Sequence, residues 1–193
     1  NQRIIVNGGT SVYGTDAKRQ YQRSTAAHST ITIDGESSSD VWGGFRVARR
    51  AKVQNVSSGQ NDKYVWAHGQ HDGYRHLPGR PMHHREWILN DNELRITDVI
   101  LGHKVHTIRV NFPIAPRIVP LQKSEKCIEL RDEDDNSLKC IVSFSHPSLV
   151  TIEKTSWHPN FGVSIASWRI HFELKVALPI KLESIISWRD RSE

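Results

Sequence analysis

Two histidine-rich stretches hold side chains that could do chemistry. The first covers residues 68–76 and the second residues 81–85, and both mix His and Arg with glycine or proline. Histidine can accept a proton, donate a proton or bind a metal near neutral pH. Two interpretations stay open: a polar lip around a binding site, or a solvated loop followed by a hairpin. The spacing fits no standard zinc pattern, so no metal is predicted there.

A third stretch, residues 20–30, places Arg23 and His28 close to the start of a predicted strand. Both are candidate functional side chains. The alternative is a surface turn that leads into the strand, and the residues taken alone favour that alternative. The six tryptophans are equally ambiguous, because large rings usually pack in a core but one or two at a loop could stack on sugar rings.

Several standard catalytic motifs are absent from the sequence. It contains no P-loop, no Gly-x-Gly-x-x-Gly after a strand, no His-Glu-x-x-His and no Cys-x-x-Cys pair. It also lacks the Gly-x-Ser-x-Gly elbow of serine hydrolases. Nucleotide binding and serine hydrolysis are therefore disfavoured.

Composition narrows the class of protein further. The chain has 193 residues, 24% charged and 37% hydrophobic, which suits one globular domain. The formal net charge of +5 is compatible with an acidic partner, whereas no nucleic-acid recognition motif is present. No stretch approaches the roughly 20 apolar residues of a membrane-spanning helix. The chain begins at Asn1 without a leader, so we expect either a removed leader or a fragment of a longer protein.

The elements that must position these side chains are predicted to be strands. Apolar and polar residues alternate most clearly over residues 105–112, which stop at Pro113, and over residues 164–176. Further strands are predicted at residues 31–34, 45–49, 63–68, 87–89, 94–99, 138–144, 149–152 and 182–188. No segment longer than about two turns has a helical period. The pattern predicts an all-β antiparallel sandwich or barrel, with residues 57–62 as an exposed loop.

The two cysteines are predicted to be free thiols. Cys140 shares a strand face with apolar residues, whereas Cys127 falls on the opposite face of its own strand. Side chains that point to opposite faces cannot meet the geometry of a disulfide.

Seven segments together resemble the C-terminal domain of heparinase II/III-like polysaccharide lyases. The resemblance is specific in the first 50 residues and looser after about residue 120. It rests on residues 3–14, 23–35, 41–47, 71–74, 84–85, 94–98 and 157–162.

This resemblance implies a fold, a reaction and a cellular location. The fold would be a large antiparallel β-sandwich of two packed sheets, with residues 1–193 as one domain of a longer lyase whose N-terminal helical toroid is absent. The longer protein would cleave a uronate-containing acidic polysaccharide by β-elimination in the periplasm or outside the cell. Its partners would be that polysaccharide and its own toroid, with no nucleic acid and no membrane span. The chain alone is expected to be inactive.

The resemblance also suggests site residues. Members of the family carry a zinc site, whose positions fall here on His28 and Asn7, with a third ligand upstream of residue 1. An amide is a poorer zinc ligand than a carboxylate, so no cofactor is expected in this chain, and zinc is compatible only with the longer protein. No catalytic residue can be assigned. The predicted substrate contacts are Arg23, His71, Tyr74, His84 and Arg85.

Two alternatives to a part of a lyase stay open. A non-catalytic carbohydrate-binding module would bind a polyanionic glycan, and the binding would weaken with salt. A structural module that braces the toroid would expose an apolar or mixed surface in isolation.

Overall fold

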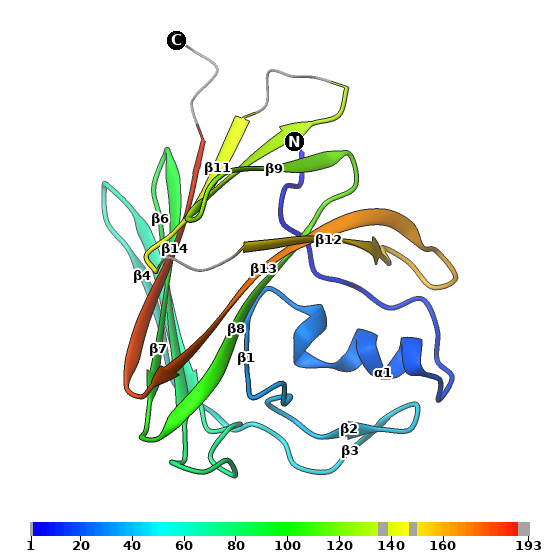
Figure 1. Ribbon diagram of the computed structural model, residues 1–193, viewed down its shortest axis with the longest axis vertical. Helices are drawn as coiled ribbons and strands as arrows, with labels where there is room; N and C mark the ends of the chain where they lie inside the picture. The colour runs from blue at the N-terminus through cyan, green and yellow to red at the C-terminus, as the bar shows by residue number, and fades with distance from the viewer. Residues whose placement is uncertain (1, 135–138, 147–149, 189–193) are drawn as a thin grey trace.

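The chain folds as two antiparallel sheets packed face to face, with one short helix at the side (Figure 1). The computed structural model describes residues 2–134, 139–146 and 150–188. The smaller sheet has the order β1 (Ile31–Ile33), β8 (Val105–Ile114), β13 (Ile165–Ala177), β12 (Val150–Trp157). The predicted all-β sandwich is confirmed.

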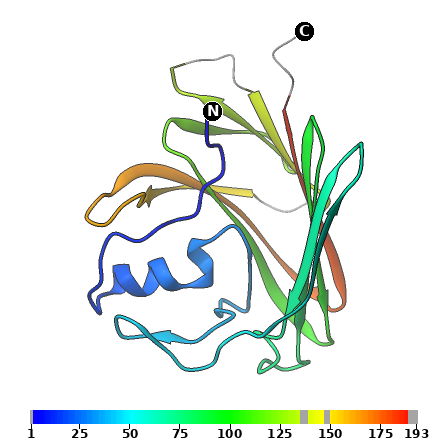
Figure 2. The same ribbon diagram turned by 180° about the vertical axis from the view of Figure 1, so that it is seen from behind.

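The larger sheet has eight strands and extends past the smaller one (Figure 2). Consecutive strands pair along both halves of it, β4 to β7 and β9 to β11, and the C-terminal strand inserts between β7 and β11. Its order is β4 (Val53–Gln60), β5 (Val65–His71), β6 (Met82–Leu89), β7 (Glu93–Leu101), β14 (Ile180–Trp188), β11 (Lys139–Phe144), β10 (Cys127–Asp132), β9 (Ile118–Ser124).

The core lies between the sheets and follows from the alternation in the sequence. Successive side chains of a strand point to opposite faces, so every second residue of β8 is directed inward. Burying each such side chain contributes about 1.5–3 kcal/mol of transfer free energy. The residues of β8 and β13 that fill the core are Ile108, Val110, Phe112, Ile114, Ile170 and Phe172. They face Ile128, Leu130 and Val142 of the large sheet within the same apolar cluster.

Strands β8 and β4 differ from the sequence prediction, and strand β9 was not predicted at all. Strand β8 continues through Pro113, because the N–H that proline lacks would face the N-terminal segment rather than β13. On that side only the Pro113 carbonyl forms a hydrogen bond, which it accepts from the N–H of Val6. Residues 57–60, predicted as loop, belong to strand β4. They are polar and mostly exposed, but an edge strand needs only one hydrogen-bonded neighbour, and β4 pairs with β5 across a bulge.

The two cysteines behave as the alternation predicts. Both are free thiols; Cys140 is buried and Cys127 is half-buried. Burial raises the pKa of the Cys140 thiol to about 11.

A short helix, α1 (Ala17–Arg23), lies against the outer side of the four-stranded sheet, followed by the 3₁₀ turn η1 (Thr25–Ala27) (Figure 1). The Asp16 side chain caps α1 by accepting the N–H of Arg19 at 2.8 Å. From the sheet, Arg169 of β13 donates to the carbonyl of Ala26. Seven residues are too few to produce a helical period in the sequence. A small hairpin, β2 (Val41–Trp42) and β3 (Arg46–Val47), lies beside the helix.

None of the helices in the described part of the chain has the length and apolar character that a membrane crossing would require.

Candidate functional site

His28 and Asn7, predicted from separate parts of the sequence, are in contact. The Nδ1 atom of His28 lies 3.0 Å from Oδ1 of Asn7. The same Oδ1 accepts the backbone N–H of Gly9 at 3.3 Å, so it is an acceptor and His28 Nδ1 carries the proton. Burial lowers the pKa of His28, which favours the neutral ring at pH 7. Its Nε2 is therefore left with a lone pair that can bind a metal or accept a proton.

These two residues do not form a zinc site by themselves. Zinc takes at least three protein ligands, and Asn7 offers an amide that is already hydrogen-bonded to His28. Within residues 2–134, 139–146 and 150–188, no group of three or more His, Cys, Asp or Glu side chains is placed to hold a metal ion.

Arg23 lies at the end of α1 and holds the β2–β3 turn. Its guanidinium donates to the carbonyls of Gly43 at 3.0 Å and Arg46 at 2.9 Å, and more weakly to that of Trp42. Three carbonyl contacts fix this side chain in place. Arg23 therefore positions the turn, and its predicted contact with substrate stays a prediction.

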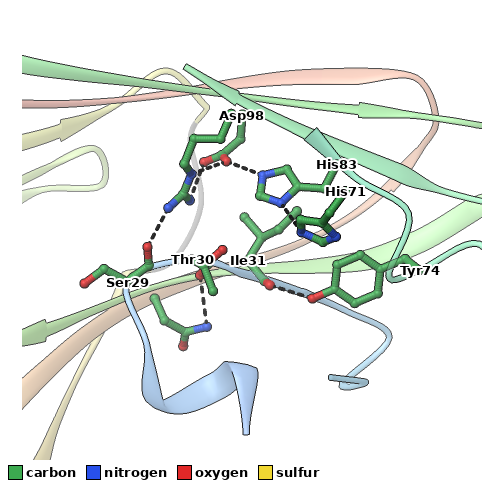
Figure 3. A network of polar contacts seen from close by, with 9 residues as sticks. Ser29, Thr30, Ile31, His71, Tyr74, His83 and Asp98 are labelled. Atoms are coloured by element: carbon green, nitrogen blue, oxygen red, sulfur yellow. Dashed lines mark hydrogen bonds and ion pairs between the residues drawn. The ribbon is translucent and has the colours of Figure 1, made fainter. Parts of the chain in front are cut away.

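A second polar cluster is buried where the larger sheet extends past β1 (Figure 3). Its centre is Asp98 of β7, 1% exposed, which accepts two hydrogen bonds from Arg85 at 2.6 and 2.8 Å and one from His83 at 2.5 Å. Arg85 also donates to the carbonyl of Ser29, just before β1. Neighbouring strands put these side chains opposite each other, because Arg85 pairs with Asp98 in the β6–β7 register.

The cluster continues through two neutral histidines. The Gly73 N–H donates to Nδ1 of His71 at 3.2 Å, so the His71 proton is on Nε2 and points to Nδ1 of His83 at 3.1 Å. His83 then donates its Nε2 proton to Asp98. Burial lowers the pKa of His83. Burial, together with the neighbouring His83, lowers the pKa of His71 to about 4. Burial alone would raise the pKa of Asp98, but Arg85 and His83 hold it well below its usual range.

An apolar hollow of about 440 Å³ opens beside this cluster. Its walls include Val53, Val56 and Trp87, and its polar edge includes His71 and Ser29. The Arg85 guanidinium lies 5.8 Å from the centre of the Trp87 ring. Most of the cluster is hydrogen-bonded internally, so the hollow presents mainly apolar surface to a ligand.

Two predicted contacts lie outside this hollow. Tyr74 is fully buried, and its hydroxyl donates to the carbonyl of Ile31 at 2.7 Å. It anchors β1 beneath the cluster. His84 lies on the outer face of the large sheet, where its ring is 5.7 Å from that of His68. The structure thus brings His71 and Arg85 together but leaves Tyr74, His84 and Arg23 apart from the hollow.

Asp98, which holds the buried cluster together, was not among the predicted site residues. Its only signal was its place in a segment of the family resemblance. No role was predicted for His83 either, although this residue lies in one of the two histidine-rich stretches.

Comparison with known protein families shows to which family the chain belongs. The model of the family "Heparinase II/III-like, C-terminal" matches residues 1–189. The chain belongs to this family. The predicted resemblance is thereby confirmed over nearly the whole sequence. No match was found among curated protein sequences.

Solved structures of heparinases have the same fold as this heparinase II/III-like C-terminal domain. The heparan sulfate lyase HepC from Pedobacter heparinus superimposes with a TM-score of 0.77 at 14% identity, over 100% of this chain and 29% of HepC. A structure named heparinase III matches with a TM-score of 0.72 at 13% identity, over 97% of this chain and 28% of the other. The chain thus spans less than a third of the length of these enzymes.

The stability of this heparinase-like domain is expected to fall between pH 6.5 and pH 4 because of His71. The unfolded chain takes up a proton near pH 6.5, whereas folded His71 does so only near pH 4. Stability is therefore full above pH 6.5 and decreases as the pH falls, by up to about 3 kcal/mol at 1.4 kcal/mol per pKa unit. The groups around His71 are His83, Asp72, Arg85 and Asp98.

Urea unfolding at a series of pH values measures this effect. The His71→Gln variant cannot take up the proton, so its stability is expected to change less over the same pH interval. Equal pH dependence of the variant and the parent chain would contradict the assignment to His71.

Proposed function

We propose that this chain is the C-terminal β-sandwich domain of a lyase that cleaves a uronate-containing acidic polysaccharide. Membership of the heparinase II/III-like family over residues 1–189 carries this proposal. The shared fold with HepC, a heparan sulfate lyase in which the matched region is 29% of the chain, supports it. The remainder of the protein would include a helical toroid that packs against the sandwich, and the location would be periplasmic or extracellular.

The proposed reaction is β-elimination. A base removes the proton next to the uronate carboxylate, the bond to the glycosidic oxygen breaks, and a carbon–carbon double bond forms in the ring. An acid returns a proton to the leaving oxygen. Cationic or hydrogen-bonding groups must neutralise the carboxylate so that the adjacent proton becomes acidic.

This domain would form one wall of the cleft where the reaction takes place. His28 keeps a free Nε2 lone pair at the end of η1, held in orientation by Asn7. We assign no catalytic role within the chain. Zinc would bind only where the longer protein adds ligands to His28, and retention of one zinc per chain by the 193-residue domain after dialysis would contradict this.

Formation of unsaturated uronide ends tests the function. These ends absorb near the ultraviolet edge, so the longer protein should produce a rising absorbance on heparan sulfate, alginate or a related polysaccharide. The 193-residue chain alone should produce none. Robust turnover by this chain alone would refute the proposal that essential groups lie elsewhere.

A bracing role has one observation in its favour. The inner face of β4, β5 and β6 exposes Val53, Val56, Val65, Trp87 and Leu89 beyond the edge of the smaller sheet. Deleting the domain from the longer protein should abolish folding if bracing is its main role. Retained folding with lost affinity for polysaccharide would favour a binding role instead.

A further inference from the structure

Three exposed aromatic rings contact one another beside α1, and a fourth exposed ring, that of Trp42, belongs to the same β2–β3 hairpin as one of them. They come from three segments far apart in the sequence: the N-terminal segment, the β2–β3 hairpin and the β12–β13 loop. Large exposed apolar groups that cluster in this way usually mark an interaction site. We call this set the aromatic platform; its members are Tyr13, Trp42, Phe45 and Phe161, with exposed fractions of 55, 50, 69 and 62%.

Contacts among the rings and with Arg19 hold the platform in place. Phe161 stacks on Tyr13 with ring centres 4.8 Å apart, and Phe45 lies 5.6 Å from Tyr13. The guanidinium of Arg19, a buried residue of α1, lies 5.3 Å from the Tyr13 ring and 5.6 Å from the Phe45 ring. Cation–π contacts of this kind fix the positions of the rings.

Backbone contacts tie the three segments together. The N–H of Gly162 donates to the carbonyl of Ser11 at 2.9 Å, which joins the β12–β13 loop to the N-terminal segment. The Nε atom of Arg19 donates to the carbonyl of Gly44 at 3.1 Å, and Gln20 donates to that of Gly43 at 2.7 Å. Arg23 adds the carbonyl contacts described above. The exposed rings are thus preorganised, which reduces the entropic cost of binding.

The charge around the platform is strongly positive. Residues 10–23 and 40–50 contain six basic and two acidic residues, so these two segments account for four of the five net positive charges of the chain. Both acidic side chains are engaged: Asp16 caps α1, and Asp40 pairs with Arg49. The Arg46 guanidinium lies over the Trp42 ring, 4.5 Å from its centre, and stacks on one of its faces. The half of Trp42 that stays exposed therefore lies next to a cation.

We infer that the aromatic platform binds sugar rings of an acidic polysaccharide, with Trp42 and Phe161 stacking on their C–H faces and Arg46 meeting a carboxylate or sulfate group. A pyranose ring presents apolar C–H groups on one face and polar groups at its edge, and this combination matches aromatic faces beside a cation. The positive field of the two segments would attract the chain of the polymer. The inference rests on the proposed function and names the surface of this domain that would bind the polysaccharide.

Calorimetric titration of the 193-residue chain with size-fractionated heparan sulfate and alginate oligosaccharides tests this inference. At low salt, the parent chain should bind at least one of them and should bind a neutral oligosaccharide of equal length more weakly. Trp42→Ala and Phe161→Ala should each weaken the binding by about tenfold or more. Arg46→Gln should weaken it and also make it less dependent on salt, because one ionic contact is lost.

Tyr64→Ala is the matched control. Tyr64 is also an exposed aromatic residue, but it lies in the turn between β4 and β5, away from the platform. It should leave affinity unchanged within about twofold. Because the side chains of Trp42 and Phe161 are at least half exposed, these variants should keep the circular dichroism spectrum and unfolding midpoint of the parent chain.

The outcomes separate this surface from the proposed function. Binding by the parent chain that Trp42→Ala and Phe161→Ala leave intact would overturn the platform while the function stands. Failure of the parent chain to bind any acidic oligosaccharide at low salt would also overturn it, and the elimination assay on the longer protein would then decide the function independently. Unchanged affinity of Trp42→Ala, with loss of folding when the same change is made in the longer protein, would assign the platform to contact between domains.

Discussion

Replacing Asp98 with alanine is expected to lower the free energy of unfolding by about 3–5 kcal/mol, the usual cost of removing one partner of a buried ion pair. The variant leaves Arg85, 5% exposed, without its carboxylate. It also removes the acceptor of the His83 proton. Both groups are at most 5% exposed, so little water can replace the lost contacts, and the variant bears most of the cost of burying them unpaired. Denaturation with urea measures the loss.

Glu173→Ala provides the control for this prediction. Glu173 pairs with Arg109 at 2.9 Å on the outer face of the smaller sheet, where both side chains are exposed. Exposed pairs contribute about 0–1 kcal/mol, so this variant should stay within that range. If Asp98→Ala cost no more than Glu173→Ala, the buried cluster would not hold β6, β7 and β1 together.

Replacing Gly9 with alanine is expected to cost about 2–5 kcal/mol, the second large effect. Gly9 has φ of +76°, where an L-residue is strained. A Cβ atom built there would lie 1.9 Å from the carbonyl oxygen of His158. Gly9 and His158 form a parallel bridge that keeps the N-terminal segment against the end of β12. The backbone must therefore separate there.

Gly35→Ala separates the two causes. Gly35 has nearly the same φ, +75°, but a Cβ atom there meets nothing within 4 Å. This variant should show only the conformational cost of about 1–2 kcal/mol. Comparing the unfolding free energies of both variants therefore isolates the effect of the close approach. Equal losses would contradict the tight contact between Gly9 and His158. A larger loss for Gly9→Ala should be accompanied by a changed environment of His28, which NMR of its ring protons would report.

The fold was predictable because its strands are buried on one face. The alternation of Ile108, Val110 and Phe112 on β8 has only one register in which the apolar side chains reach the core. The same argument placed Cys140 inward. Strand β4 was not predicted, because it is an edge strand with mostly exposed residues, and its sequence therefore shows no alternation of apolar and polar side chains.

The candidate site was only partly predictable, because its contacts depend on register and on long-range packing. Asp98 meets Arg85 through the pairing of β6 with β7, and a shift of one residue would separate them. The aromatic platform needs Phe161 to return beside Tyr13, a contact between residues nearly 150 positions apart. Family resemblance did place Asn7 with His28, because it carries information on distant contacts that a local pattern lacks.

The mass of the cleavage products tests the proposed function most directly. Elimination breaks the glycosidic bond without adding water, so one of the two fragments carries a double bond. Mass spectrometry of products that the longer protein makes from a uronate polysaccharide should therefore find fragments lighter by one water molecule than hydrolysis products of the same length. Fragments that carry the added water, or no fragments from any acidic polysaccharide, would contradict the proposal that this β-sandwich is part of a lyase.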